Sequence, residues 1–167
     1  NIIIRLHKLF KDRKFHEDLR WKDFDKTLEL DLGNTPIEDL IAKSRLGIHS
    51  YDSTGMLETF SQNIPTLAFW QNGLSHLCES AKPHYKILVD AGIIHLSPSS
   101  ISKKVNEIWN DVDDWWNQEH IQEAKNQFCS IYAKNCKKPT RLLKSILLEE
   151  EINFSIKNFI SDKKNND

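Results

Sequence analysis

The pattern of hydrophobic and polar residues changes near Ser97. Before it, apolar residues gather in short runs that are β-branched or alternate with polar residues, as in strands buried on one or both faces. These runs predict five strands, over residues 1–7, 27–32, 46–49, 66–70 and 93–96. After it, apolar residues recur at helical spacing, which predicts helices over residues 100–109, 114–135 and 140–160.

Helices are also predicted between the strand-like runs. Thr35 suits a helix cap and Pro36 the first helical position, ahead of a short amphipathic helix that ends near Ser44. A second helix follows the polar loop after the third run, and a third helix is closed by Gly92. Residues 8–26 are dense in charged and aromatic side chains and fit a surface loop or a short helix.

Strands that alternate with helices imply parallel pairing and helices on both faces of a sheet. The predicted fold class is therefore α/β, with an open, doubly wound, mostly parallel sheet followed by C-terminal helices. We assign residues 1–160 to one domain and residues 161–167 to a frayed polar tail.

Composition narrows the class of protein. The chain has 167 residues, of which 39% are hydrophobic and 28% charged, a balance that supports a packed core. A net charge of −1 gives no general case for nucleic-acid binding. No apolar run approaches the ~20 residues of a membrane-spanning helix, and three widely spaced cysteines predict reduced thiols and a cytoplasmic location. Because Met56 is the only Met and the chain opens at Asn1 in an apolar run, we expect it to be part of a longer chain.

The loop after the third predicted strand is the most informative place for chemistry, because ligands of doubly wound sheets bind beyond the carboxyl ends of strands. Ser53, Thr54 and Gly55 stand where that strand turns into a helix. Their hydroxyls, the free backbone N–H groups and the positive end of the helix suit a phosphate. Glu58, on the following turn, can accept two hydrogen bonds from a ribose diol. The alternative is that Ser53 or Thr54 only caps the helix and that Glu58 is a solvated side chain.

A second group of candidate residues ends the first predicted strand. Alternation places Arg5 and His7 on one side of this strand and Lys8 on the other. Cationic donors at this position can neutralise a diphosphate or a leaving phosphate, although for this group alone ordinary surface charges are the favoured interpretation. The two groups form one site only if this strand end lies beside the Ser53 loop.

Several established motifs are missing from the sequence. The histidines show no metal-ligand spacing, and the serine-hydrolase, P-loop and dinucleotide fingerprints do not occur. We therefore expect no metal site and no dinucleotide cofactor.

Two apolar groups in the helical part have a structural and a functional interpretation. For Trp109, Trp115 and Trp116, packing of the helices on the sheet is favoured over a stacking platform for a sugar or base. For an apolar stripe near the end of the chain, packing within the chain is favoured over docking on another domain or chain. The stripe consists of Leu142, Leu143, Ile146, Leu147 and Ile152.

The sequence also resembles a known family. Residues 44–70, SRLGIHSYDSTGMLETFSQNIPTLAFW, resemble the nucleotide-sugar-binding half of glycosyltransferases with the GT-B architecture of two Rossmann-like domains. The matching pattern is a strand, a Ser/Thr-rich turn, a helix with Leu-Glu-Thr, then Asn-Ile-Pro and another strand. The RLH near the start, ESAKPHYKILVDAGIIHLSP at residues 79–98 and VNEIWNDVDDWW at residues 105–116 are similar to transferases of bacterial surface-carbohydrate (O-antigen) biosynthesis.

The resemblance implies that this chain is the C-terminal, donor-binding domain of such a transferase, with the acceptor held by an N-terminal domain outside the chain. It implies that Glu58 contacts the ribose. The donor contacts that it implies come from Ser50, Asp52, Ser53, Thr54 and Gly55. Bacterial sialyltransferases of related architecture place a His-Pro pair and a Ser-Ser/Thr pair around the phosphate of a CMP-sugar. His7 and Ser53-Thr54 look like these elements, with Lys8 in place of the proline, so a CMP-sugar is favoured while UDP-, GDP- and TDP-sugars stay open.

The resemblance also implies a division of labour in the reaction. His7 and Arg5 would stabilise the leaving phosphate without a bound metal or a cofactor, and the catalytic base would lie on the missing domain. This part alone is then expected to be inactive. The full enzyme would act in the cytoplasm, at the inner face of the membrane where its acceptor is membrane-bound. Left open are an epimerase or polyol-phosphate transferase of the same architecture and a non-catalytic α/β interaction module.

Overall fold

The structure is a computed structural model that describes residues 1–10, 14–134 and 137–149. Each of the five predicted strands is present within its predicted range or overlaps it. They are β1 (Ile3–Arg5), β2 (Glu29–Asp31), β3 (Gly47–His49), β4 (Thr66–Phe69) and β5 (Ile94–His95).

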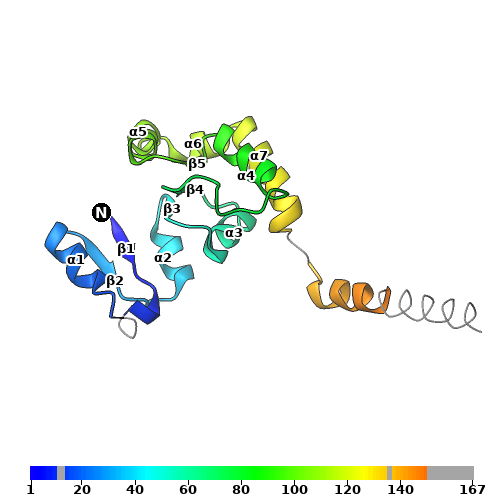
Figure 1. Cartoon of the computed structure of the whole chain (residues 1–167), viewed down its shortest axis with the longest axis horizontal. Helices are drawn as coiled ribbons and strands as arrows, with labels where there is room; N and C mark the ends of the chain where they lie inside the picture. The colour runs from blue at the N-terminus through cyan, green and yellow to red at the C-terminus, as the bar shows by residue number, and fades with distance from the viewer. Residues whose placement is uncertain (11–13, 135–136, 150–167) are drawn as a thin grey trace, which may run out of the picture.

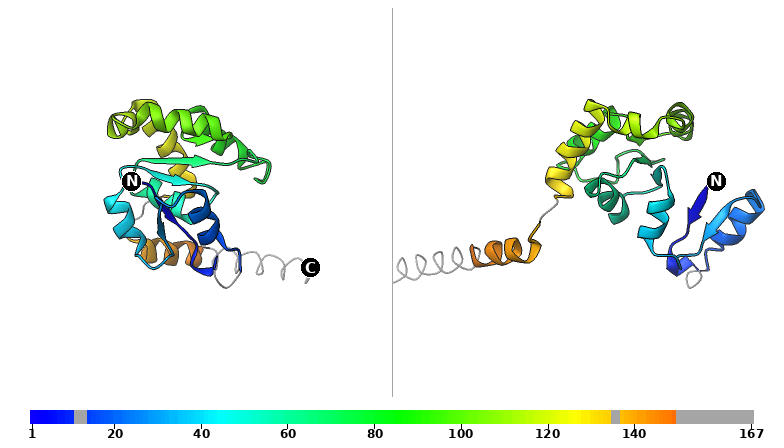
Figure 2. Two further views of the ribbon diagram at one scale, coloured as in Figure 1. Left: turned by 90° about the vertical axis from the view of Figure 1, so that its left-hand side faces the viewer. Right: turned by 180° about the vertical axis from the view of Figure 1, so that it is seen from behind.

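The described strands divide between two parallel sheets. β1 pairs with β2, and Arg5 stands opposite Asp31 in the register. β3, β4 and β5 form the second sheet, with β4 in the centre. The predicted α/β class with parallel pairing is confirmed, but the single sheet we expected is realised as two. Helix α2 (Ile37–Lys43) lies between them in Figures 1 and 2.

The helices follow the predicted alternation. α1 (Glu17–Phe24) realises the short helix allowed for residues 8–26, next to the 3₁₀ turn η1 (Lys8–Phe10). The helix predicted over residues 114–135 is divided, because Asn117 and Gln118 interrupt it. The further helices are α3 (Thr54–Ser61), α4 (Lys82–Asp90), α5 (Pro98–Ile108), α6 (Val112–Trp116) and α7 (Glu119–Tyr132).

The hydrophobic core surrounds β4, whose Leu67 and Ala68 are fully buried. α7 packs against α3 and α4, while α5 packs against β4 and β5. Trp115 and Trp116 are buried in this core, which confirms the packing interpretation of these two rings. Trp109 is 45% exposed, and the Arg45 guanidinium lies over its ring, so it is a surface residue.

Residues 139–149 form a helix that extends away from the rest of the chain (Figures 1 and 2). Four members of the apolar stripe lie on it with 44–58% of their surface exposed, so packing within the described chain is not found for them. Ile152, like the end of the helix predicted over residues 140–160 and the tail at 161–167, lies outside the described residues.

A hydrogen-bond network fastens the small sheet to the start of α2. The buried Asp31 carboxylate accepts from the amides of Gly33 and Thr35, and Arg5 Nη1 lies 2.8 Å from its Oδ2. Thr35 is therefore held by Asp31 and does not cap the helix, for which Pro36 occupies the cap position. Gly33 has φ +82°, and a Cβ there would lie 2.8 Å from Lys8 Cγ and 3.2 Å from the Leu6 carbonyl oxygen. This turn needs glycine.

Candidate functional site

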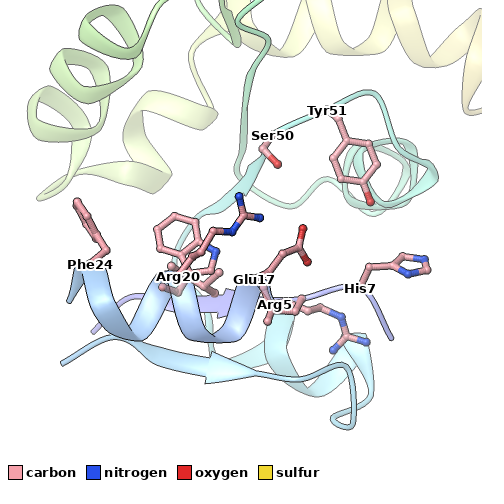
Figure 3. Close-up of a pocket in the computed structure, with 10 residues that line it drawn as sticks. Arg5, His7, Glu17, Arg20, Phe24, Ser50 and Tyr51 are labelled. Carbon is pink, nitrogen blue, oxygen red and sulfur yellow. The ribbon is translucent and has the colours of Figure 1, made fainter. Parts of the chain in front are cut away.

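An open pocket of about 750 Å³ lies between β1, α1 and the end of β3 (Figure 3). Both strands contribute their carboxyl ends, which is where parallel α/β folds bind ligands. The lining residues are Ile4, Arg5, Leu6, His7, Glu17, Arg20, Trp21, Phe24, Ser50 and Tyr51. The volume is in the range of pockets for small organic ligands.

The pocket joins the two regions that the sequence singled out. Arg5 and His7 come from the end of β1, and Ser50 comes from the loop after β3. Four consecutive residues, 4–7, line the wall, and side chains of a strand alternate between faces. The pocket therefore runs along the edge of β1 that β2 does not pair.

Arg5 lines this pocket with its backbone side, while its guanidinium points elsewhere. In Figure 3 the guanidinium lies on the far side of β1, away from Arg20 and Ser50. Its Nη1 donates to Asp31 Oδ2 at 2.8 Å and to the Thr35 carbonyl oxygen at 2.7 Å. Burial would raise the pKa of Asp31, but hydrogen bonds from Thr35 and Gly33 and the Arg5 charge hold that pKa below its ordinary value. The Arg5 guanidinium therefore links β1 to Asp31 and to the Thr35 carbonyl group and does not point into the pocket.

His7 is exposed at the rim of the pocket. Its Nδ1 accepts a hydrogen bond from the Leu9 amide at 3.2 Å. A ring nitrogen that accepts carries no proton, so this contact places the proton on Nε2. His7 Nε2 is therefore left as a hydrogen-bond donor at the rim of the pocket.

The loop at the start of α3 lies beyond the wall of the pocket, which takes only Ser50 and Tyr51 from it among the described residues. Ser53 is the residue before the helix, yet its side chain makes no capping hydrogen bond. Thr54 and Glu58 are exposed to solvent. The hydroxyls predicted for a phosphate are thus not used by the helix itself.

His49, which no sequence motif marks as a site residue, lies against this loop. A Cβ at Gly55 would stand 3.3 Å from His49 Cε1, so glycine allows the first turn of α3 to rest on the imidazole. His49 Nε2 lies 3.3 Å from Thr59 Oγ1, which itself donates to the Met56 carbonyl oxygen. Burial lowers the pKa of His49, so the ring is neutral at neutral pH. His49 supports the loop.

Asp52 points toward the next loop of the large sheet. Its Oδ2 lies 3.2 Å from His76 Nε2, in the segment that follows β4. Asp52 and Ser50 therefore leave the same loop in different directions, since Ser50 faces the pocket (Figure 3).

Helix α1 supplies the pocket residues that the sequence analysis missed. Arg20 points into the pocket toward Ser50, with Glu17 beside it (Figure 3). The Arg20 guanidinium makes no ion pair within residues 1–10, 14–134 and 137–149. Trp21 and Phe24 form an edge-to-face pair with ring centroids 6.1 Å apart, and Phe24 is 79% exposed. The only sequence signal for these residues was the density of charge and aromatic rings over residues 8–26.

Residues 1–10, 14–134 and 137–149 contain neither a metal-ligand cluster nor a helix suited to span a membrane. No group of three or more His, Cys, Asp or Glu side chains there is placed to hold a metal ion. No described helix has the length and hydropathy that a membrane span requires.

Parallel strands that alternate with helices define an α/β domain, and its open pocket lies at strand ends, where such folds commonly bind ligands. The model of the LIC12162 family of transferases matches residues 1–147, and the chain belongs to this family. This confirms the transferase class predicted from the sequence. No curated protein and no solved structure matches the chain.

Proposed function

We propose that the chain is the donor-binding part of a glycosyltransferase and that the pocket between β1, α1 and β3 holds a nucleotide-sugar. Membership of a transferase family supports the reaction class. The observation that carries the donor assignment is the composition of the pocket, in which a cation, polar donors and aromatic rings converge.

The polar side of the pocket suits phosphate. Arg20 has a guanidinium aimed into the pocket, and guanidinium groups bind phosphate with paired hydrogen bonds (Figure 3). His7 Nε2 and the Ser50 hydroxyl add neutral donors at the other walls. Together they surround a diphosphate or a single phosphate with donors from three elements.

The apolar side of the pocket suits a base or a sugar ring. Trp21 and Phe24 present aromatic surface on the same helix as Arg20. Aromatic faces stack on nucleobases and on the C–H faces of sugars, and Trp and Tyr rings combine apolar area with a polar handle. Tyr51 supplies such a ring opposite α1.

The start of α3 is the second anchor of the proposed donor. Ser53, Thr54 and Gly55 offer hydroxyls and backbone N–H groups at the positive end of an eight-residue helix. Glu58 is exposed on the next turn, and its carboxylate would accept hydrogen bonds from a ribose diol. A donor of nucleotide-sugar length would lie from the pocket toward this loop.

The proposed reaction is attack of an acceptor hydroxyl on the anomeric carbon of the donor. The bond from that carbon to the phosphate oxygen breaks, and its electron pair stays on the phosphate. Arg20 and His7 stabilise the developing charge, because donors that are already oriented lower the energy of the transition state. A CMP-sugar is the first donor to test, followed by UDP-, GDP- and TDP-sugars, and the acceptor is a surface carbohydrate precursor.

Isothermal titration calorimetry with CMP, UDP, GDP, TDP and their sugars tests this proposal. We expect one nucleotide series to bind and the Arg20→Ala variant to bind it about tenfold more weakly, the loss of one charge-assisted contact. Arg141→Ala, an exposed arginine on the helix of residues 139–149, is the matched control and should bind normally. Absence of binding by the wild-type chain, or equal losses in both variants, contradicts the proposal.

A further inference from the structure

A second polar constellation lies outside the pocket, at the carboxyl ends of β3 and β4. These strands are parallel neighbours, so the loops that follow them meet at the same edge of the sheet. Asp52 comes from the loop after β3, and His76 comes from the segment after β4. His76 Nε2 lies 3.2 Å from Asp52 Oδ2, and both side chains are partly exposed, at 38% and 43%.

The His76 ring is held on the hydrophobic core by an aromatic neighbour. It meets Trp70 edge to face, with centroids 5.2 Å apart, and Trp70 is only 4% exposed. Trp70 in turn packs against Tyr85, whose ring contacts Phe128 in the core. A surface ion pair of two long side chains would lack this support.

Two further observations concern the surroundings of the His76–Asp52 pair. Trp70 Nε1 is buried and has no hydrogen-bond acceptor within the described residues. Buried donors without a partner are rare in proteins and call for a ligand or water oxygen. Burial raises the pKa of Tyr85, and the negative charge of Asp52 raises it further.

The contact with Asp52 favours a proton on His76 Nε2 and leaves Nδ1 as an acceptor. A histidine oriented by a carboxylate at one nitrogen is suited to take a proton at the other. Asp52 directly follows Ser50 and Tyr51, which line the pocket, so the His76–Asp52 pair lies at the same edge of the large sheet as these two pocket residues.

We propose that His76 is the general base of the transfer reaction and that Asp52 is its positioning residue. This inference rests on the proposed function. The acceptor is a hydroxyl compound whose O–H proton passes to His76 Nδ1 while its oxygen bonds to the anomeric carbon. The leaving phosphate departs with the electron pair, and the Asp52 carboxylate stabilises the imidazolium that forms. The base is thus supplied by this chain, where the sequence analysis expected it on a preceding domain.

The test measures nucleotide release from the donor by the transferase chain in its active, full-length form. We expect His76→Gln to lower kcat about a hundredfold, the usual contribution of a general base, with an unchanged Kd for the nucleotide. Asp52→Asn should lower kcat less, and imidazole in solution should restore part of the turnover of a His76→Gly variant. His120→Gln, an exposed histidine on α7, is the control and should retain full activity.

A second measurement follows reaction of each histidine with diethyl pyrocarbonate by mass spectrometry. His76 should react faster than His120, and the Asp52→Ala substitution should slow the reaction of His76 with the reagent. If His76→Gln binds the donor and its turnover is unchanged, or if imidazole does not rescue His76→Gly, His76 is not the general base, while the proposed donor site stands. Equal reactivity of the two histidines also overturns it, whereas absence of nucleotide binding by the wild-type chain overturns the proposed function and this inference together.

Discussion

Asp31 shows how one buried carboxylate organises the entrance of the site. It accepts from two backbone amides and from Arg5, and this places the residues of β1 along the pocket. Because the pKa of Asp31 is lower in the folded chain than in the unfolded one, its stabilising effect is present above its ordinary pKa, about 4. It is lost as the pH falls through the lowered value in the folded state.

Asp31→Asn is therefore expected to lower the free energy of unfolding by about 2–3 kcal/mol at neutral pH. The difference from the wild type should shrink as the pH falls below about 4, where the unfolded state takes up its proton first, and it should stop changing once the folded state is protonated as well. Urea unfolding at a series of pH values measures this difference in the free energy of unfolding. Asp39→Asn, an exposed carboxylate on α2, should show no such change, and a difference that stays constant with pH contradicts the assignment.

Residue roles were harder to predict than residue positions. The sequence predicted Arg5 at the end of a strand, and this position is correct. It also predicted that the Arg5 charge would face a phosphate of the ligand. The register of β1 on β2 puts Arg5 opposite Asp31, and that carboxylate captures the guanidinium. Such a long-range pairing leaves no local signal, and neither does the placement of Arg20, which depends on how α1 packs beside β1.

At the scale of elements, the turn after α3 joins the sheet to the late helices. Asn63 has φ 58° there, and its backbone and side-chain oxygens both accept from Trp116 Nε1 of α6, at 3.1 and 3.2 Å. Buried Lys125 of α7 donates to the same side-chain oxygen at 2.6 Å. Burial lowers the pKa of Lys125, since its neighbour is an amide and carries no charge.

Trp116→Phe removes the indole donor from this junction and leaves a small cavity beside Phe60. We expect the free energy of unfolding to fall by about 1–3 kcal/mol. Trp109→Phe is the matched control, because that ring is 45% exposed and its loss should cost less than about 0.5 kcal/mol. Chemical unfolding followed by circular dichroism compares the two, and equal losses would show that α6 is not anchored in this way.

Element type was predictable because the strands and helices carry strong periodicity, and each predicted strand was found. The break between α6 and α7 was not, because apolar residues continue at helical spacing across Asn117 and Gln118. Periodicity was also insufficient for the apolar stripe, whose described members are exposed. Helical spacing predicts an apolar face on a helix but does not say which surface covers that face.

At the scale of the whole molecule, the division of the described strands between two sheets determines where the pocket lies. The sequence predicted one sheet with ligand chemistry at its strand ends. Among the described residues, one edge of β1 is unpaired, and α1, β1 and the loop after β3 line an open pocket beside it. Arg5 and His7 at the end of β1 and Ser50 after β3 all line this pocket, whereas Ser53, Thr54 and Gly55 of the same loop lie beyond its wall.

The central claim is that this pocket binds the donor of a family transferase, and an NMR titration of the ¹⁵N-labelled chain tests it most directly. The nucleotide that binds most tightly in calorimetry, or CMP where none is detected, is added stepwise while the backbone amide signals are followed. The account predicts saturable shifts at His7, Arg20, Ser50 and Tyr51, with smaller shifts at the start of α3. Shifts confined to α5, α6 and α7, or none at millimolar nucleotide, would contradict it.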